Sequence, residues 1–216
     1  AYLQRWLTPP QRYQQISKSD SSHPFPVYLV IADGGASKSG YWVSSVLAKM
    51  EAETTSDPFS NHLLSLAGAS GGSVGNAAFY SLLKDGMSGN HTGLYAETEQ
   101  FFKTDFLSFS LARFLGVDLF KNFVPLPFIN DRASALATAM EKLPKGTVIG
   151  DRFAKPVEEI LDSTGRLPLL FINTTHLQAG HPCLISSVCY DTGFSARWDV
   201  LSLLDNTYPG KTMKLS

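Results

Sequence analysis

Two short apolar runs, each followed by small residues and then by a helical pattern, constrain the fold of this chain more than any other feature. The first run covers residues 27–32 (VYLVIA) and leads into 33–40 (DGGASKSG). The second covers residues 63–67 and leads into 68–75 (GASGGSVG). Continuous apolar runs of this length are typical of buried parallel strands. Two strand–turn–helix units in succession therefore predict an α/β fold with a mostly parallel sheet.

The helical patterns after the two turns predict which side chains face the core. The expected inner faces are, after the first turn, Trp42, Val46, Leu47 and Met50 and, after the second, Val74, Ala78 and Leu82, with Gly86 as a helix stop. Further helices are expected over 98–106, from Asp131 onward and over 151–161, and further strands over 168–173 and 183–188. We expect 1–24 to be an irregular, proline-punctuated lead-in and 25–216 to form one domain.

Charge and cysteine content exclude several classes of protein. The chain has 18 basic and 19 acidic residues, interleaved along its length, so nucleic acid is not expected as a partner. Cys183 and Cys189 are too few for a disulfide framework and form no C-x-x-C pair. Two buried free thiols are expected, with a single disulfide as the alternative. The sequence implies no metal and no organic cofactor, and no apolar run approaches the roughly 20 residues that span a membrane.

The segment GASGGSVG fits two motifs with different chemistry. Gly68, Gly71 and Gly75 after a strand could let a pyrophosphate approach a helix N-terminus, as in dinucleotide-binding proteins. That motif calls for a second strand about 20 residues later that ends in an acidic residue. Here a helical pattern and a polar stretch follow instead, which disfavours a nucleotide-binding oxidoreductase.

The same segment contains G-x-S-x-G, the turn that presents a nucleophilic serine. Gly68 and Gly72 would let a strand and a helix pass closely on either side of Ser70. A serine nucleophile also needs oriented N–H groups to stabilise the oxyanion. Adjacent parallel strands would bring the upstream turn at Gly34 and Gly35 beside Ser70, where its N–H groups could serve. The competing interpretation is a tight turn with an unreactive serine.

Several segments together resemble the patatin-like phospholipases, specifically their bacterial branch. They are residues 32–42 (ADGGASKSGYW), 68–73 (GASGGS), 131–133 (DRA), 168–170 (PLL) and 173–175 (NTT). The resemblance covers roughly residues 25–216. It implies a three-layer α/β/α fold with a mostly parallel central sheet, and a Ser–Asp dyad that hydrolyses acyl esters of lipids through an acyl-enzyme. It makes Ser70 the nucleophile, and the N–H groups of Gly34, Gly35, Ala36 and Gly71 the oxyanion hole.

The chain departs from the family pattern at three points. Ala36 stands where a third glycine is usual, which is costly if that residue has positive φ. Lys38, expected to support the anion, stands where the family usually has Arg and lacks its bidentate fork. The family's Asp-Gly-Gly or Asp-Gly-Ala segment does not follow Ser70. We therefore expect the catalytic aspartate to lie outside these 216 residues and the fold to be incomplete at its C-terminus.

Two questions stay open at the level of sequence. A catalytic triad in the order Ser…Asp…His would need Asp162 with His176 or His181. The simpler alternative is that these histidines lie in loops and have no catalytic role. Eight of the fourteen phenylalanines lie between Phe101 and Phe128, either as core packing or as an acyl pocket or membrane-facing cap. The alternative to a hydrolase of lipid or other acyl esters is a non-catalytic protein that binds lipid or a partner.

Overall fold

A mostly parallel sheet forms the centre of the molecule. A computed structural model of the chain describes residues 2–54, 56–86, 91–118, 132–162, 164–176, 179–188 and 197–215. In these residues one sheet holds, in spatial order, β1 (Tyr28–Ala32), β2 (Leu63–Ala69), β3 (Leu169–Thr175), β4 (Pro182–Ser186) and β5 (Trp198–Asp199). All neighbouring strands are parallel except the antiparallel pair β3 and β4. The predicted α/β class with a mostly parallel sheet is therefore confirmed.

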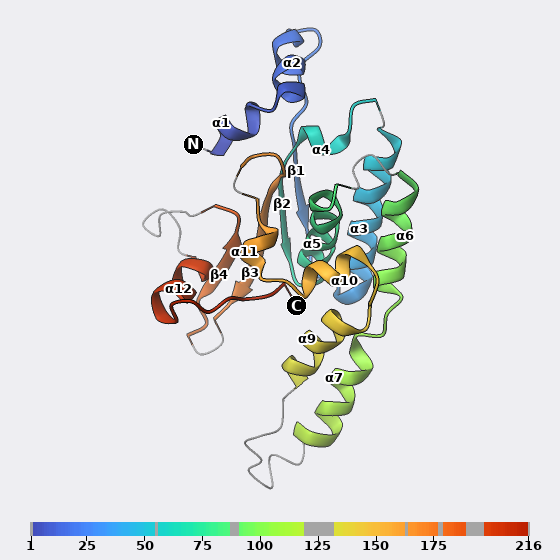
Figure 1. Ribbon diagram of the computed structural model, residues 1–216, viewed down its shortest axis with the longest axis vertical. Helices are drawn as coiled ribbons and strands as arrows, with labels where there is room; N and C mark the ends of the chain where they lie inside the picture. The colour runs from blue at the N-terminus through green and yellow to red at the C-terminus, as the bar shows by residue number, and fades with distance from the viewer. Residues whose placement is uncertain are drawn as a thin grey trace.

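Helices flank this sheet, and most of them gather beside β1, β2 and β3 (Figure 1). Helix α5 (Gly71–Lys84) packs directly on these strands, while α3 (Ala36–Glu53) and α6 (His91–Phe102) pack on α5 and on each other. The remaining described helices are α1 (Tyr2–Leu7), α2 (Pro10–Lys18), α4 (Phe59–His62), α7 (Leu107–Arg113), the π-helical turn η2 (Phe114–Asp118), α9 (Arg132–Lys142), α10 (Val148–Phe153), α11 (Val157–Ile160) and α12 (Val200–Thr207).

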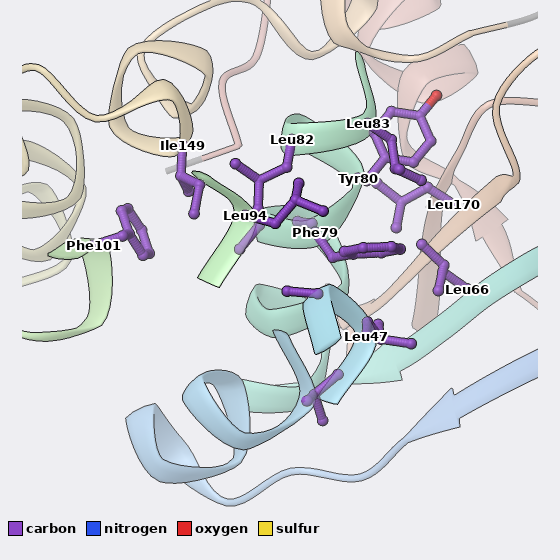
Figure 2. Close-up of a cluster of buried hydrophobic side chains, with 14 of the residues drawn as sticks. Leu47, Leu66, Phe79, Tyr80, Leu82, Leu83, Leu94, Phe101, Ile149 and Leu170 are labelled. Atoms are coloured by element: carbon purple, nitrogen blue, oxygen red, sulfur yellow. The ribbon is translucent and has the colours of Figure 1, made fainter. Parts of the chain in front are cut away.

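The core lies between the sheet and α5, where Figure 2 shows large side chains from several elements interdigitating. Ala78 and Leu82 are fully buried, as the helical pattern after the second turn predicts. After the first turn the predicted face is partly wrong. Leu47 is buried, but Trp42 is 66% exposed and the buried stripe of α3 runs through Val43 and Ala48. The physical reason is that α3 meets α5 through small residues, so its bulky Trp42 is turned outward.

Strand β1 is an edge strand, which corrects the expectation of a fully buried one. Its only sheet neighbour among the described residues is β2. Val30 and Ala32 face the helices, whereas Leu29 and Ile31 on the other face are 65% and 83% exposed. Because side chains alternate across a strand, an apolar run is buried on both faces only where both faces are covered.

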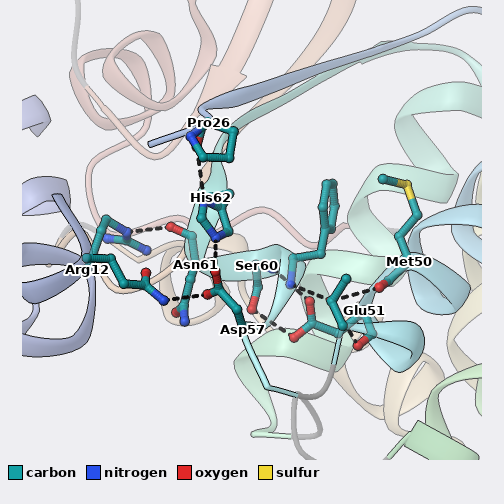
Figure 3. Close-up of polar contacts among 11 residues, drawn as sticks. Arg12, Pro26, Met50, Glu51, Asp57, Ser60, Asn61 and His62 are labelled. Carbon is teal, nitrogen blue, oxygen red and sulfur yellow. Dashed lines mark hydrogen bonds and ion pairs between the residues drawn. The ribbon is translucent and has the colours of Figure 1, made fainter. Parts of the chain in front are cut away.

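The N-terminal segment is helical, so the prediction of an irregular lead-in over residues 1–24 is wrong. Pro10 occupies the first turn of α2, a place where proline starts a helix rather than blocking it. The indole of Trp6 is buried and donates to the carbonyl of Leu63 at 3.1 Å. Arg12 donates to the carbonyl of Asn61 at 2.7 Å (Figure 3). The segment is therefore anchored to the start of β2.

Prolines and local capping also set the other boundaries. The expected helix over 151–161 is two helices, α10 and α11, because Pro156 interrupts the backbone between them. The helix expected over 98–106 begins earlier and ends at Phe102, and α7 starts separately at Leu107, where the Asp105 carboxylate accepts the N–H groups of Leu107 and Ser108. Strands β3 and β4 confirm the predicted pair. Asp131 and Cys189 lie outside the described residues, and Cys183 is a buried free thiol.

Candidate active site

The two small-residue turns meet at the C-terminal ends of β1 and β2. Ala32 pairs with Gly68 in the parallel register, so each strand ends beside the other. A Cβ placed on Gly34 would lie 3.1 Å from the Cβ of Ser70 and 3.7 Å from its Oγ. The expected juxtaposition of the two turns is therefore confirmed.

Ser70 occupies a strained turn between β2 and α5. Its φ is 51° and its ψ is −127°, a backbone conformation that residues with a side chain rarely adopt. The residue is exposed, as are Ala69 and the adjacent Gly34, whereas the first turn of α5 directly after it is buried. Backbone strain of about 1–3 kcal/mol per residue persists only where neighbouring structure enforces it, and it is frequent at active sites. This geometry matches a nucleophile elbow, in which a sharp strand-to-helix turn presents a hydroxyl.

The glycines around Ser70 are required by close backbone contacts. A Cβ on Gly72 would lie 2.6 Å from the carbonyl oxygen of Asp33, and a Cβ on Gly71 would overlap the carbonyl oxygen of Ala36. A Cβ on Gly68 would lie 2.7 Å from the amide nitrogen of Ser73. The first turn of α5 is thus wedged against the backbone of the upstream turn.

The upstream turn exposes several backbone donors. Among the residues that the structure describes, none accepts a hydrogen bond from the N–H groups of Gly34, Gly35, Ala36 or Gly71. The turn itself is held by Ser39, whose hydroxyl donates to the carbonyl of Asp33 at 2.7 Å. Free N–H groups at the start of a helix suit a developing negative charge. The local arrangement is thus compatible with an oxyanion hole.

Ala36 has a φ of 53°, so the third position of the turn does use the left-handed region. Alanine there carries a steric cost that glycine would not. Lys38 lies in the first turn of α3 and is exposed, and it is not among the residues that line the cavity beside Ser70. The structure therefore places Gly34, Ala36 and Gly71 beside the serine or its cavity, and it sets the Lys38 side chain apart from the cavity.

Ser70 opens onto an apolar cavity of about 400 Å³. Its polar lining comes from the two turns and from Thr104 and Asp105 in the α6–α7 connection. Its apolar lining comes from α5, α6 and α9 and from Phe106 and Leu107 at the start of α7. The lining residues are Ala36, Ser37, Ser70, Gly71, Val74, Phe102, Thr104, Asp105, Phe106, Leu107, Leu136 and Met140. The sequence left Phe102 and Phe106 open between core packing and an acyl pocket. Leu136 and Met140 of α9 were expected on an inner helix face, because apolar residues at helical spacing are typical of a core.

The phenylalanine-rich segment contributes both to the core and to the lining of the cavity. Phe101 is fully buried and packs edge-to-face on Phe153 with ring centroids 5.2 Å apart. Phe102 and Phe106 line the cavity of Ser70. Phe109 is 55% exposed. Phe120, Phe123 and Phe128 lie outside the described residues.

The carboxylates of Asp105 and Asp162 accept hydrogen bonds from residues that follow them in their own loops. Asp105 lines the cavity, but hydrogen bonds from the side chain and backbone of Ser108 lower the pKa of its carboxyl and weaken it as a base. Asp162 accepts hydrogen bonds from Thr164, Arg166 and Leu167 in its own loop. Its carboxylate is therefore occupied by loop donors, which argues against the order Ser…Asp162…His.

The two histidines of that alternative lie against an aromatic ring. His176 and His181 both pack on Trp198, with ring centroids 5.5 Å and 4.6 Å away. Nδ1 of His176 also accepts the N–H of Ala179 at 3.2 Å. These contacts fix the β3–β4 connection, so the structure assigns them a role in that loop.

Two asparagines that sequence reasoning did not place in the site clamp the end of β2. Asn76 of α5 donates to the carbonyl of Ala67 at 3.0 Å, and Asn173 of β3 donates to that of Gly68 at 2.8 Å. Arg197 in turn donates to the Asn173 side chain at 2.7 Å. Two sequence features could have identified these asparagines. Asn173 ends an apolar strand pattern, and Asn76 is a polar residue within the apolar face of a helix.

No group of three or more His, Cys, Asp or Glu in the described part of the chain could hold a metal ion. Within those same ranges, no helix combines the length and the apolar character needed to cross a bilayer. Comparisons of the chain with models of protein families, with curated proteins and with solved structures found no match.

Proposed function

We propose that this protein is a serine acyl hydrolase of the patatin-like type, acting on carboxylic esters with an apolar acyl chain. The observation that carries the proposal is the position of Ser70, on a strained turn, against a second turn with free N–H groups, at the mouth of an apolar cavity. Each of these features has a separate role in acyl transfer, and their coincidence favours a hydrolase over a tight turn with an unreactive serine.

In the proposed reaction, Oγ of Ser70 attacks the ester carbonyl carbon while its proton passes to a general base. The carbonyl electrons move onto oxygen, and the N–H groups of Gly34, Gly35, Ala36 and Gly71 stabilise that oxyanion. The bond from carbon to the leaving oxygen then breaks and the alcohol departs with a proton. Water attacks the acyl-enzyme in the same manner and releases the carboxylic acid and free Ser70. One oxyanion donor is typically worth about 3–4 kcal/mol of barrier.

The apolar wall of the cavity supports an acyl chain as the group bound next to Ser70. Phe102, Phe106 and Met140 offer apolar contact, and about 25 cal/mol is gained per Å² of apolar surface removed from water. The scissile carbonyl would sit at the polar end, between Ser70 and the upstream turn. The finer fold belongs to the same proposal: a three-layer α/β/α arrangement of the patatin-like type.

The glycine contacts argue against the dinucleotide interpretation. The space beside Gly71 and Gly72 is filled by the backbone of Ala36 and Asp33, so it is not open to a pyrophosphate. The segment after α5 is helical where described, with α6 and α7 before the next strand β3. A pyrophosphate loop needs that space and normally a strand soon after.

A fluorophosphonate probe tests the proposal, because it phosphonylates a serine only when the hydroxyl is activated. We expect the protein with its dyad aspartate present to be labelled at Ser70, and its Ser70→Ala variant to be unlabelled. The 216 residues alone should be labelled weakly or not at all, because the expected base lies outside them. The matched control is Ser37→Ala, which removes a second hydroxyl from the same cavity and should retain labelling. Peptide mapping of the adduct identifies the residue.

Two results would decide against a hydrolase. Absence of labelling in the protein with its dyad aspartate present, together with fatty-acid binding, would favour a non-catalytic lipid-binding protein. A rise in melting temperature with a dinucleotide, without labelling, would favour the nucleotide interpretation. Labelling that persists in Ser70→Ala would move the nucleophile elsewhere.

A further inference from the structure

The helices α7 and α9, with η2 between them in sequence, form an arm at one end of the molecule. Helix α7 packs mainly on α9 and η2. Figure 1 shows the arm at the opposite end of the long axis from α1 and α2. One side of α7 therefore contacts α9, and most of its remaining surface is exposed.

This surface is unusually apolar for a helix in contact with water. Leu107, Phe109 and Leu111 are 58%, 55% and 56% exposed, and Leu115 in η2 is 59% exposed. None of the residues of α7 is buried. A water-exposed helix normally buries its apolar stripe and carries polar residues elsewhere. By their four-residue spacing Leu107, Leu111 and Leu115 share one face, whereas Phe109 lies on another, so α7 exposes apolar side chains on more than one side. Exposed apolar surface of this kind marks an interaction surface.

Cationic side chains lie beside the patch. Arg113 and Lys142 line a groove of about 350 Å³ between α7 and α9, together with Phe109 and Leu143. Neither cation forms an ion pair with a described residue. Among the nearby acids, Glu141 is paired with Lys214 at 2.8 Å, and Asp105 caps the first turn of α7. Apolar and aromatic residues flanked by unpaired cations are typical of surfaces that lie in the headgroup region of a bilayer.

The same two helices also border the cavity of Ser70. Leu107 of α7 is exposed and lines that cavity, as do Leu136 and Met140 of α9. An acyl chain leaving a bilayer at the arm would thus stay in contact with apolar side chains on its way to Ser70. A folded protein partner would not require this continuity, which favours lipid as the occupant.

We propose that the arm docks this protein onto a lipid bilayer that carries anionic headgroups. Phe109, Leu111 and Leu115 enter the boundary between headgroups and acyl chains, and Arg113 and Lys142 contact lipid phosphates. The purpose of this docking, the delivery of a lipid ester to Ser70, rests on the proposed function. The binding itself does not.

Flotation with vesicles tests the docking, using the Ser70→Ala chain so that no lipid is consumed. We expect it to float with vesicles of phosphatidylcholine and phosphatidylglycerol, and more weakly with phosphatidylcholine alone. Adding Phe109→Ser and Leu111→Ser should reduce binding at least roughly tenfold, because two apolar anchors are lost. The matched control is Leu3→Ser with Tyr13→Ser, which are equally exposed (54% and 64%) at the opposite end and should leave binding unchanged.

The cations are tested separately. Arg113→Gln with Lys142→Gln should lower binding roughly 30-fold on anionic vesicles, since each basic residue near such a surface contributes about 1 kcal/mol. The same change should have little effect on phosphatidylcholine alone. Circular dichroism of each variant checks that it is folded.

The outcomes separate the two proposals. Equal flotation of the Phe109→Ser, Leu111→Ser chain and its parent would overturn the docking proposal. So would a dimeric wild-type chain that becomes monomeric with these substitutions, because the patch would then bind a second copy. In a chain that keeps Ser70, Phe109→Ser with Leu111→Ser should leave fluorophosphonate labelling in solution intact. Vesicle binding without any labelling of Ser70, in the protein with its dyad aspartate present, would contradict the proposed hydrolase function but would be consistent with the docking proposal.

Discussion

The two strand–turn–helix units share one plan and differ in what surrounds them. β1 leads into α3 with Ala36 at a φ of 53°, and β2 leads into α5 with Ser70 at a φ of 51°. However, twelve of the fourteen residues of α5 are buried, against six of the eighteen in α3. β1 is also an edge strand, whereas β2 has a neighbour on either side. The same positive-φ turn thus occurs once beside a largely exposed helix, at Ala36, and once beside a largely buried helix, at Ser70.

This difference suggests a division of labour between the two turns. Strain at Ser70 is enforced by packing on every side of α5, which fixes the direction of a single hydroxyl. Strain at Ala36 lies at the surface, where, under the proposed function, the turn would supply backbone N–H groups to the oxyanion. A reactive side chain needs a rigid support more than backbone donors do, because its own rotamers must also be limited.

The largest expected effect comes from separating the two units. Gly71→Ala places a Cβ onto the carbonyl of Ala36 and should force α5 away from the upstream turn. We expect the free energy of unfolding to fall by about 2–3 kcal/mol, as for overpacked cores. Urea denaturation measures it.

Gly116→Ala is the control for this substitution, because a Cβ there meets nothing within 4 Å. It should be neutral within about 0.5 kcal/mol. Equal stability of the two variants would show that the turns are not in contact and would remove the basis of the comparison.

A smaller loss of stability is expected where the loop at Asp162 contacts α5. The hydroxyl of Tyr80 in α5 accepts the N–H of Asp162 at 2.7 Å. Burial raises the pKa of the Asp162 carboxyl, but hydrogen bonds from Thr164, Leu167 and Arg166 outweigh burial and leave that pKa below its usual value. A carboxylate with a lowered pKa stabilises the fold above its unfolded pKa of about 4, and this stabilisation is lost as the pH falls through the folded value.

Asp162→Asn should therefore cost about 2 kcal/mol of stability at pH 7, as expected for hydrogen bonds to a charged group. The difference from wild type should shrink as the pH falls below about 4. Thermal unfolding across pH measures this, with exposed Asp205→Asn as the control that changes little. A difference that stays constant down to pH 2 would mean that ionisation of Asp162 contributes nothing.

The smallest effects concern the strain itself. Ser70→Gly and Ala36→Gly each remove a side chain from a positive-φ position, and stability should rise by about 1 kcal/mol, more at Ser70 than at Ala36. Ser37→Gly, in the ordinary helical part of α3, should instead lower it by about 1 kcal/mol. Fluorophosphonate labelling should disappear only in Ser70→Gly. If Ser70→Gly and Ala36→Gly both lowered the free energy of unfolding, the backbone at these positions would not be strained.

Much of the site could be predicted from sequence because its elements are local. The run before GASGGSVG predicted β2, and the G-x-S-x-G spacing predicted the sharp turn at Ser70. The chain also predicted that a second turn would lie beside it, since adjacent parallel strands end at one edge. The burial of β1 and the inner face of α3 were predicted less well. Both depend on which neighbours cover them, and apolar composition does not encode that.

The amino-acid sequence by itself therefore determined the two strand–turn–helix units, their order and the residues of the two turns, because apolar periodicity and small residues act over a few positions. Only the tertiary structure decided three further things. It made β1 an edge strand, anchored α1 on β2 through Trp6 and α2 on α4 through Arg12, and joined α5, α6, α7 and α9 around one apolar cavity. The physical reason is that these features arise from contacts between segments far apart in the chain, where packing and burial decide among side chains that look alike in sequence.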